Sequence, residues 1–368
     1  MTERADRWCE ELLPRVAVRQ WVLTVPWPRR WLLARRPDLT KGVHRIAVRE
    51  IQRYLRTRMR KPMGEGGGLT VIQRFGSSLT LNLHFHILTL DGLYDKDRRT
   101  GGTRWFGAPP LSQRGVEALV VRIADKTEAW LAKQGLGPEA EREEEPDDAL
   151  GVIQEAAVAG RSASTGGRRA KRVQRLGGRE FALPRLCAGC DGYNLHAGVV
   201  IKARDRDGLH RLCRYVARPP LARERLSETP LGRVRIALKR QWSDGSVAIE
   251  LSRVEFLERL VAQVPPPRAN QVLYHGVLAA RSSLRRVVQP RPSPRAQPDQ
   301  VPCLRLTKAA PGNSRWLPWS TLLWKTFQVD GFACPCCNRQ MRLRAVVLPP
   351  ATLDVLSSLE RSARGPPG

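Results

Sequence analysis

Two histidines separated by one residue are the feature of this sequence that most clearly suggests chemistry. They lie in the stretch 81–92, LNLHFHILTLDG, whose period-two alternation predicts a β-strand that ends at a turn. Side chains two apart on a strand point to the same face, so the imidazoles of His84 and His86 should lie side by side. Such a pair can hold one divalent metal ion. The alternative is that two histidines simply share a solvent-facing side of a sheet.

A tyrosine among arginines is the second candidate. Tyr215 lies in RLCRYVARPP, part of a short helix predicted from Asp205 to Arg218. Arg211, Arg214 and Arg218 have helical spacing, so they share one face that Tyr215 borders. A phenol, with a pKa of about 10, is a weak nucleophile at neutral pH, and guanidinium groups or a metal ion favour its anion. The segment could therefore bind and attack a phosphodiester, or it could be an amphipathic helix with a solvated basic face.

A third metal ligand is expected, because two histidines rarely suffice. His196 lies in the predicted strand 193–203, YNLHAGVVIKA, shortly before the tyrosine helix. Asn82, Asn194 or a carboxylate could take its place. His196 could equally be a buried structural histidine.

The cysteines suggest a separate, structural metal site. Eight cysteines without a visible secretory signal indicate free thiols or metal ligands rather than disulfides. Cys334 and Cys337 form a Cys-x-x-Cys knuckle, which supplies two of the four ligands of structural zinc. Cys187 and Cys190 could supply the other two if the segments meet. Otherwise the knuckle is a half-site remnant, or the thiols are simply buried.

The charge of the chain indicates a polyanionic partner. The net charge is +28 and the sequence pI is about 11, far beyond what solubility needs. Lysines and arginines placed on phosphates release counterions, so DNA is the expected partner. A GC-rich genome would explain the preference for Arg over Lys but not the whole excess of bases over acids. No signal peptide or membrane span is visible, so a cytoplasmic, nucleoid-associated protein of a prokaryote is expected.

The surrounding elements must bring these residues together. The local patterns predict strands and helices in the order that follows: strand 18–25, helix 38–60, strands 69–75 and 81–90, helix 111–131, strand 193–203, helix 205–218, a hairpin of 234–238 and 247–251, helix 254–264 and strand-like segment 270–279. The predicted parts are two halves of one core at 1–136 and 179–284, a charged and flexible insertion at 137–178, and a proline-rich linker with a tail at 285–368.

Several stretches resemble one known family. They are RWCEELLPRVAVRQWVLTVP, VIQRFGSSLTLNLHFHILTLDGLY, LHRLCRYVARPPLARERL, VPPPRANQVLYHGVLA and FACPCCNRQMRLRAVV. Together they resemble the transposases of rolling-circle insertion sequences, the HUH tyrosine transposases. This resemblance implies an α+β core, an antiparallel sheet with packed helices, in which the tyrosine helix lies over a central histidine strand.

The resemblance also assigns roles. His84 and His86 match the family's metal-binding pair, and Tyr215 matches the nucleophile that would form a 5′-phosphotyrosine link with Mg²⁺ or Mn²⁺ bound. Members with two tyrosines carry them four residues apart, whereas Arg211 stands at that position here. The family commonly begins with a zinc-binding domain, and this sequence starts after the point where it would end. A replication initiator or relaxase with the same chemistry, and an inactive DNA-binding remnant, are alternatives; no acidic triad for a DDE transposase stands out.

Overall fold

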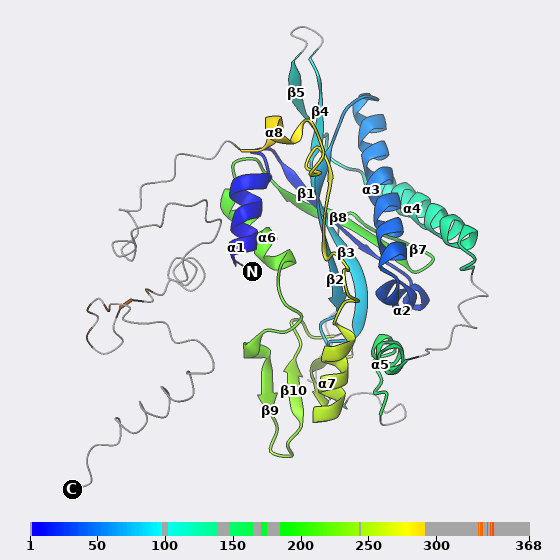
Figure 1. Cartoon of the computed structure of the whole chain (residues 1–368), viewed down its shortest axis with the longest axis vertical. Helices are drawn as coiled ribbons and strands as arrows, with labels where there is room; N and C mark the ends of the chain where they lie inside the picture. The colour runs from blue at the N-terminus through cyan, green and yellow to red at the C-terminus, as the bar shows by residue number, and fades with distance from the viewer. Residues whose placement is uncertain are drawn as a thin grey trace. The chain divides into compact units, whose positions relative to one another are not determined.

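A six-stranded antiparallel sheet carries the histidine strand in its interior (Figure 1). The strand order is β12-β2-β3-β1-β8-β7, and each neighbouring pair is antiparallel. β3 (Leu81–Leu90) lies between β2 (Gly67–Phe75) and β1 (Val18–Thr24). The fold is therefore α+β with antiparallel sheets, as predicted.

The computed structural model describes residues 2–97, 102–137, 148–164, 171–174, 185–242 and 244–290, together with residues 330, 332, 333, 337, 339 and 341. The chain divides into one unit that spans Glu3–Pro292 and a second unit, Ser293–Gly368. The remaining elements of the first unit are α1 (Thr2–Arg7), the π-helix η1 (Trp8–Leu12), α2 (Trp27–Arg35), α3 (Pro37–Met59), β4 (Gly92–Lys96), β5 (Thr103–Gly107), α4 (Gln113–Lys133), α5 (Ala149–Val158), β6 (Lys171–Gln174), β7 (Cys187–Cys190), β8 (Tyr193–Ile201), α6 (Arg206–Val216), η3 (Arg223–Arg225), β9 (Leu226–Glu228), β10 (Val234–Ala237), β11 (Ser246–Leu251), α7 (Arg253–Ala262), β12 (Val272–Gly276) and α8 (Arg285–Val288).

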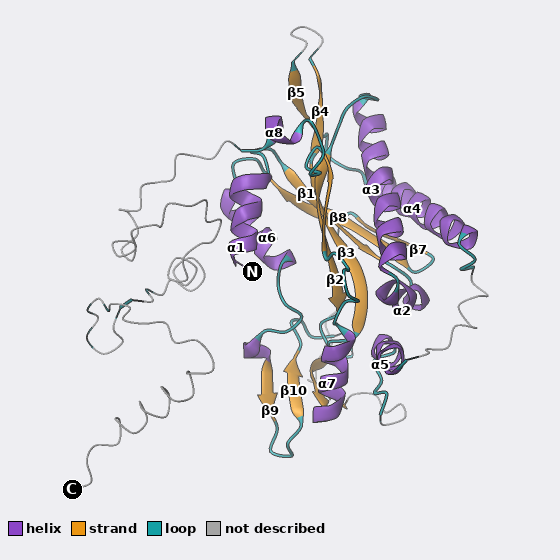
Figure 2. Ribbon diagram, viewed as in Figure 1, coloured by secondary structure: helices purple, strands orange, loops and turns teal. Residues whose placement is uncertain are grey.

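Different helices cover the two faces of the six-stranded sheet (Figure 2). Leu88 and Leu90 of β3 belong to the apolar cluster that includes side chains of α1, η1 and α6. Phe85 and Ile87 belong to the cluster that includes side chains of α2, α3 and α4. Because side chains alternate along a strand, the even-numbered residues of β3, His84 and His86 among them, face α6.

Local sequence explains where the main helices begin and end. The Asp205 side chain accepts a hydrogen bond of 2.7 Å from the Gly208 backbone N–H and so caps α6. Ser252 and Glu255 form a reciprocal capping box at the start of α7. The four predicted helices and the predicted hairpin are present, with ends displaced by a few residues.

Some of the described elements were not predicted from the sequence. No helix was expected directly after the first strand, but α2 follows it; a proline in the first helical turn sacrifices no hydrogen bond, so Pro28 is tolerated there. Within the range 137–178, for which an exposed and flexible insertion was predicted, the structure describes two elements, α5 and β6. Trp27 and Trp31 of α2 each donate an indole N–H to a backbone oxygen of the α5 region at 3.2 Å, and β6 joins a second sheet of order β6-β11-β10-β9.

The described cysteines are free thiols: Cys9, Cys187, Cys190, Cys213 and Cys337. Cys334 lies outside the described residues, and Cys337 is exposed. In the part of the chain that the structure describes, no helix combines the length and the apolar character needed to cross a membrane.

Candidate active site

The tyrosine helix lies over the histidine pair. The rings of His84 and His86 have centroids 4.9 Å apart, and the Tyr215 ring lies edge-on to His86 at 5.8 Å. Both histidines are buried, whereas Tyr215 is 46% exposed. The structure therefore brings together three side chains from β3 and α6, and it leaves the phenol accessible to a large substrate.

Hydrogen bonds decide which nitrogen of each imidazole carries the ring proton. His84 donates from Nδ1 to the backbone oxygen of Asn82 at 2.8 Å, because a carbonyl can only accept, and its Nε2 therefore carries a lone pair. His86 Nδ1 lies 2.8 Å from the side-chain amide of Gln20, while its buried Nε2 has no partner among the described residues. In this arrangement the side-chain N–H of Gln20 donates to Nδ1 of His86, so the proton of that ring lies on Nε2. Nε2 of His86 becomes a bare nitrogen when the Gln20 amide turns its oxygen toward Nδ1.

Burial keeps both imidazoles neutral. Burial is the main cause that lowers the pKa of His84 to about 4, with smaller contributions from Arg218 and Arg30. The same cause, together with the neighbouring His84 and Arg218, lowers the pKa of His86 well below its usual value. Neutral imidazole is the form that binds a metal ion, so the pair fits a divalent cation at neutral pH.

An amide on the neighbouring strand completes this face. Gln73 of β2 stands directly opposite His84 in the register, so both side chains lie on the same face. Its side-chain N–H donates a hydrogen bond of 2.8 Å to the backbone oxygen of Val216, the residue after Tyr215. Its side-chain oxygen is buried without a partner among the described residues. Gln73 thus connects the histidine strand to the tyrosine helix and offers one unused oxygen.

Cations from two segments lie near the phenol, and a third lies near one of them. The guanidinium carbon of Arg218 lies 4.2 Å from the centroid of the Tyr215 ring, and Nζ of Lys239 lies 5.8 Å from it. Partial burial, followed by the charges of Arg218 and Arg225, lowers the pKa of Lys239 to about 8. Arg225 donates to the backbone oxygens of Ala237 at 2.7 Å and Ser77 at 2.5 Å, which ties the second sheet to the turn before β3.

The remaining predicted residues lie farther out. Arg218 follows the end of α6 and reaches the site, but Arg211 and Arg214 are exposed and have no described contact with Tyr215 or the histidines. His196 is paired with Val22, which is paired with His86, so it shares their face across the width of β1. In the described structure His196 does not join His84 and His86 in a group of three side chains that could hold one metal ion.

The N-terminal helices fix α6 in place. The Cys213 and Cys9 thiols are buried in contact, and Arg206 donates to the backbone oxygen of Cys9. His210 lies 3.3 Å from Asp6 and 3.1 Å from Glu10. Asp6 first, and then Cys9 and Glu10, raise the pKa of His210 to about 10, so this ring is a cation at neutral pH. These contacts hold the tyrosine helix from the side opposite its exposed face.

Sequence reasoning did not find Gln73, Lys239 or Arg225. Gln73 could have been suspected from its even spacing with Val71 and Leu69 on the strand before the histidines. Lys239 and Arg225 carry no comparable signal, because only tertiary structure brings Lys239 to Tyr215 and Arg225 to Lys239. Among the described residues, no three His, Cys, Asp or Glu side chains are close enough to hold one metal ion. A third protein ligand would therefore be an amide oxygen or require movement.

Comparison with known families decides the affiliation of the chain. The family described as "Putative transposase" matches residues 67–286, which is more than half of the 368-residue chain. The chain belongs to this family. The matched range of the transposase contains both histidines, Gln73, Tyr215 and Lys239. No curated protein and no solved structure matches the chain. Membership indicates a role in DNA transposition, hence a DNA-processing enzyme with DNA as its partner.

Proposed function

We propose that this transposase cuts and rejoins single-stranded DNA at the ends of an insertion sequence, through a covalent link between Tyr215 and a 5′-phosphate. One observation carries the proposal: a half-exposed phenol lies edge-on to a pair of buried, neutral histidines and beneath a guanidinium group. A nucleophile, a cation and a pair of potential metal ligands thus meet at one place. This combination suits phosphoryl transfer better than binding alone.

The side chains of this site can carry out a balanced exchange of phosphate esters. The Tyr215 oxygen attacks phosphorus and releases its proton to solvent, while the bond from phosphorus to the 3′-oxygen breaks. The departing oxygen takes up a proton and becomes a free 3′-hydroxyl. Arg218 and Lys239 stabilise the negative charge that develops on the phosphate and on the attacking oxygen. A 3′-hydroxyl can later attack the tyrosyl ester, so rejoining needs no ATP.

Mg²⁺ or Mn²⁺ fits the residues present. His84 and His86 would hold it through Nε2, and the unpartnered oxygen of Gln73 would be the third protein ligand. When bound, the divalent cation supplies Lewis-acid stabilisation of the phosphate oxygens. Imidazole and amide ligands suit Mn²⁺ somewhat better than Mg²⁺.

Manganese titration tests the third ligand. Gln73→Ala should weaken Mn²⁺ binding about 10- to 100-fold, the range seen when one supporting group of a metal site is lost. Gln73→Glu should retain or strengthen it, because a carboxylate replaces the amide oxygen. Electron paramagnetic resonance reports free Mn²⁺, and His196→Ala is the matched comparison. If His196→Ala loses Mn²⁺ and Gln73→Ala does not, His196 is the ligand instead.

Covalent capture tests the nucleophile. Purified protein would be mixed with labelled single strands from the DNA that flanks its own gene, in Mn²⁺ or Mg²⁺, and examined for a protein–DNA adduct that survives denaturation. Tyr215→Phe should abolish the adduct, because phenylalanine has no oxygen to form the ester. Tyr94→Phe, a change on β4 of the two-stranded sheet, should leave it intact. Tight DNA binding without an adduct in the unaltered protein would reject the catalytic proposal and favour a DNA-binding remnant.

A further inference from the structure

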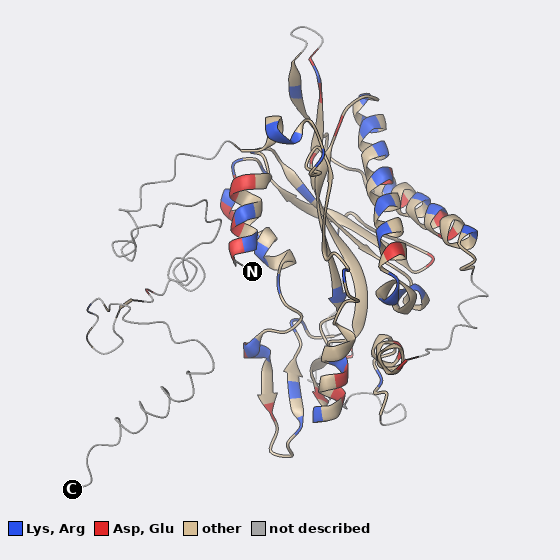
Figure 3. Cartoon of the chain, viewed as in Figure 1, with Lys and Arg blue, Asp and Glu red and all other residues tan. Residues whose placement is uncertain are grey.

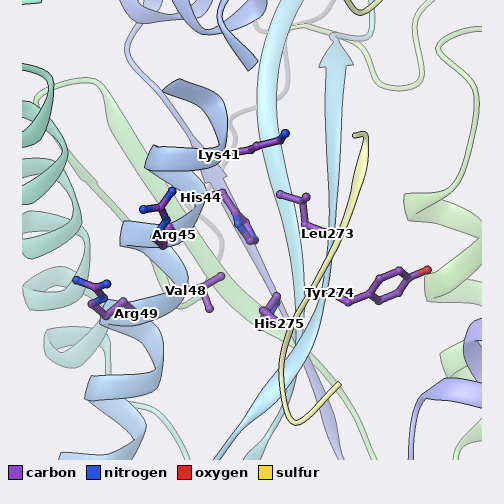
Figure 4. A pocket seen from close by; sticks show the side chains of 8 residues that line it. All are labelled: Lys41, His44, Arg45, Val48, Arg49, Leu273, Tyr274 and His275. Carbon is purple, nitrogen blue, oxygen red and sulfur yellow. The ribbon is translucent and has the colours of Figure 1, made fainter. Parts of the chain in front are cut away.

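A second site lies on the opposite face of the same sheet. A cavity of about 370 Å³ opens between α3 and β12 and is shown in Figure 4. It is lined by the residues that follow: Lys41, His44, Arg45, Val48, Arg49, Leu273, Tyr274 and His275. None of these lining residues is acidic. The cavity therefore combines apolar walls with cationic side chains and two histidines.

The two histidines form its floor. His44 from α3 and His275 from β12 are both buried, and their rings lie 5.7 Å apart. Figure 4 shows both side chains in the space between helix and strand. His44 Nε2 is 2.8 Å from the Thr70 hydroxyl, but neither ring nitrogen of His275 has a partner among the described residues. His275 is only 9% exposed, and an unpartnered polar group buried to that degree costs free energy unless a ligand satisfies it.

A row of positive charge leads to the cavity. Lys41, Arg45 and Arg49 recur every fourth residue on α3, and Arg53 continues the row. One such step is about 6 Å along a helix axis. Figure 3 shows Lys and Arg along much of α3. No carboxylate within the described residues pairs with these four side chains, so their charge is available to a ligand.

We propose that this cavity binds a backbone phosphate of DNA, with His275 as hydrogen-bond donor and Lys41, Arg45 and Arg49 as the surrounding charges. A phosphate satisfies the uncharged imidazole, which can donate one N–H, and its single negative charge offsets part of the positive charge around it. The proposal rests on the proposed function only in that DNA is the partner. It does not require Tyr215 to be a nucleophile.

The bound segment differs from the one that Tyr215 attacks. His275 pairs with Gly68, and Thr70, which contacts His44, pairs with Ile87. These residues have the opposite parity to His84 and His86 along their strands, so the cavity and the catalytic pair lie on opposite faces. A DNA strand engaged at Tyr215 must pass around the sheet to reach the cavity, or a second DNA segment must occupy it.

Binding measurements with matched charge variants test this site. Arg45→Gln/Arg49→Gln removes two exposed charges from α3, and Arg114→Gln/Lys133→Gln removes two exposed charges from α4 as the control. His275→Leu replaces the imidazole and its two nitrogens with an apolar side chain. Fluorescence anisotropy with long single-stranded DNA over a salt series gives affinity and salt dependence, and the same assay with duplex DNA shows which form supplies the phosphate. Adduct formation on a short single strand separately measures the reaction at Tyr215, on the catalytic face, which is the face of the sheet that carries His84 and His86.

The α3 variant should lower the slope of log affinity against log salt by up to about 0.7, the contribution of one phosphate contact on single-stranded DNA. The α4 control should retain the slope of the unaltered protein. His275→Leu should weaken binding roughly 2- to 10-fold, the effect of one hydrogen bond, without changing the slope, because the lost group is uncharged. The rate of adduct formation on the short strand should be the same in the α3 variant, the α4 control, His275→Leu and the unaltered protein.

Equal losses in the α3 and α4 variants would overturn the proposal, because a general surface charge would then explain binding. Unchanged affinity in His275→Leu would also overturn it. If no protein forms an adduct but the α3-specific loss persists, the catalytic proposal fails and the phosphate site stands.

Discussion

Two pairs of buried histidines lie on opposite faces of one sheet. The rings of His84 and His86 are 4.9 Å apart, and those of His44 and His275 are 5.7 Å apart. Burial lowers the pKa of His44 to about 4 and of His275 to about 3, as it lowers the pKa of His84 to about 4. By ring separation and protonation alone, the two pairs are nearly equivalent.

Their surroundings are not equivalent. The first pair has a phenol beside it, an unused amide oxygen opposite it and cations above the phenol. The second pair has a threonine hydroxyl, apolar walls and a row of unpaired cations. The comparison teaches that a histidine pair is not by itself a metal centre. In our proposals, the surrounding groups distinguish a site that holds a metal ion and a reacting phosphate from a site that only holds a phosphate.

The sharpest way to break this comparison is to remove one imidazole from each pair. His86→Ala should slow adduct formation by at least about 100-fold, the upper end of the loss that follows removal of a single group supporting a metal site. His44→Ala should leave the rate on a short strand unchanged, because that pair does not touch Tyr215. Initial rates of adduct formation at saturating Mn²⁺ measure both.

Both variants open a cavity of the same kind, so each serves as the stability control of the other. Their thermal midpoints should be similar. Equal slowing in the two variants would show that the histidine pairs act only through folding, and the distinction between the faces would be lost.

Acid should reveal the second pair through stability. In the unfolded chain His275 binds a proton near pH 6.5, whereas burial and the neighbouring His44 hold its folded pKa at about 3. Between about pH 3 and pH 6.5 the unfolded state therefore binds more protons than the folded state. The contribution of His275 to the free energy of unfolding is fully present above about pH 6.5 and falls as the pH is lowered. At pH 5 this histidine alone should cost about 2 kcal/mol of unfolding free energy.

Urea unfolding at pH 7 and at pH 5, without divalent metal, measures this loss. His44, His84 and His86 also have lowered pKa values, so their protonation destabilises the protein over the same pH range. His275→Leu should therefore reduce, but not abolish, the difference in unfolding free energy between pH 7 and pH 5. An equal loss in the variant would mean that His275 is protonated freely in the folded protein.

The smallest expected effect sharpens the description of the catalytic face. Lys239→Gln should slow adduct formation about 10-fold, less than the ~10²- to 10³-fold loss for a fully buried donor, because Lys239 is exposed. Lys239→Arg should keep the rate. Since the pKa of Lys239 is about 8, the unaltered protein should lose rate relative to Lys239→Arg as the pH rises past 8. A constant ratio of the two rates across that range would exclude Lys239 from the reaction.

Local sequence predicted the strand and the helix of the catalytic face, but not the contacts between them. Alternation placed His84 and His86 on one side of a strand, and the spacing before the double proline placed Tyr215 on a helix. The contact between them depends on which face α6 covers, and only the family resemblance suggested it. Lys239 and Gln73 join the site through the second sheet and through strand register, which no local pattern encodes. For the same reason, the pairing of His44 with His275 could not be read from segments so distant in the chain.

The amide of Gln73 connects the proposed metal site to the end of the tyrosine helix. Its nitrogen holds the backbone oxygen of Val216, and its oxygen is turned toward the face of His84. A cation that recruits this oxygen would also restrain the rotation of the amide and, with it, the last turn of α6. In the proposed mechanism, occupancy of the metal site would therefore reduce the mobility of the helix that carries the phenol.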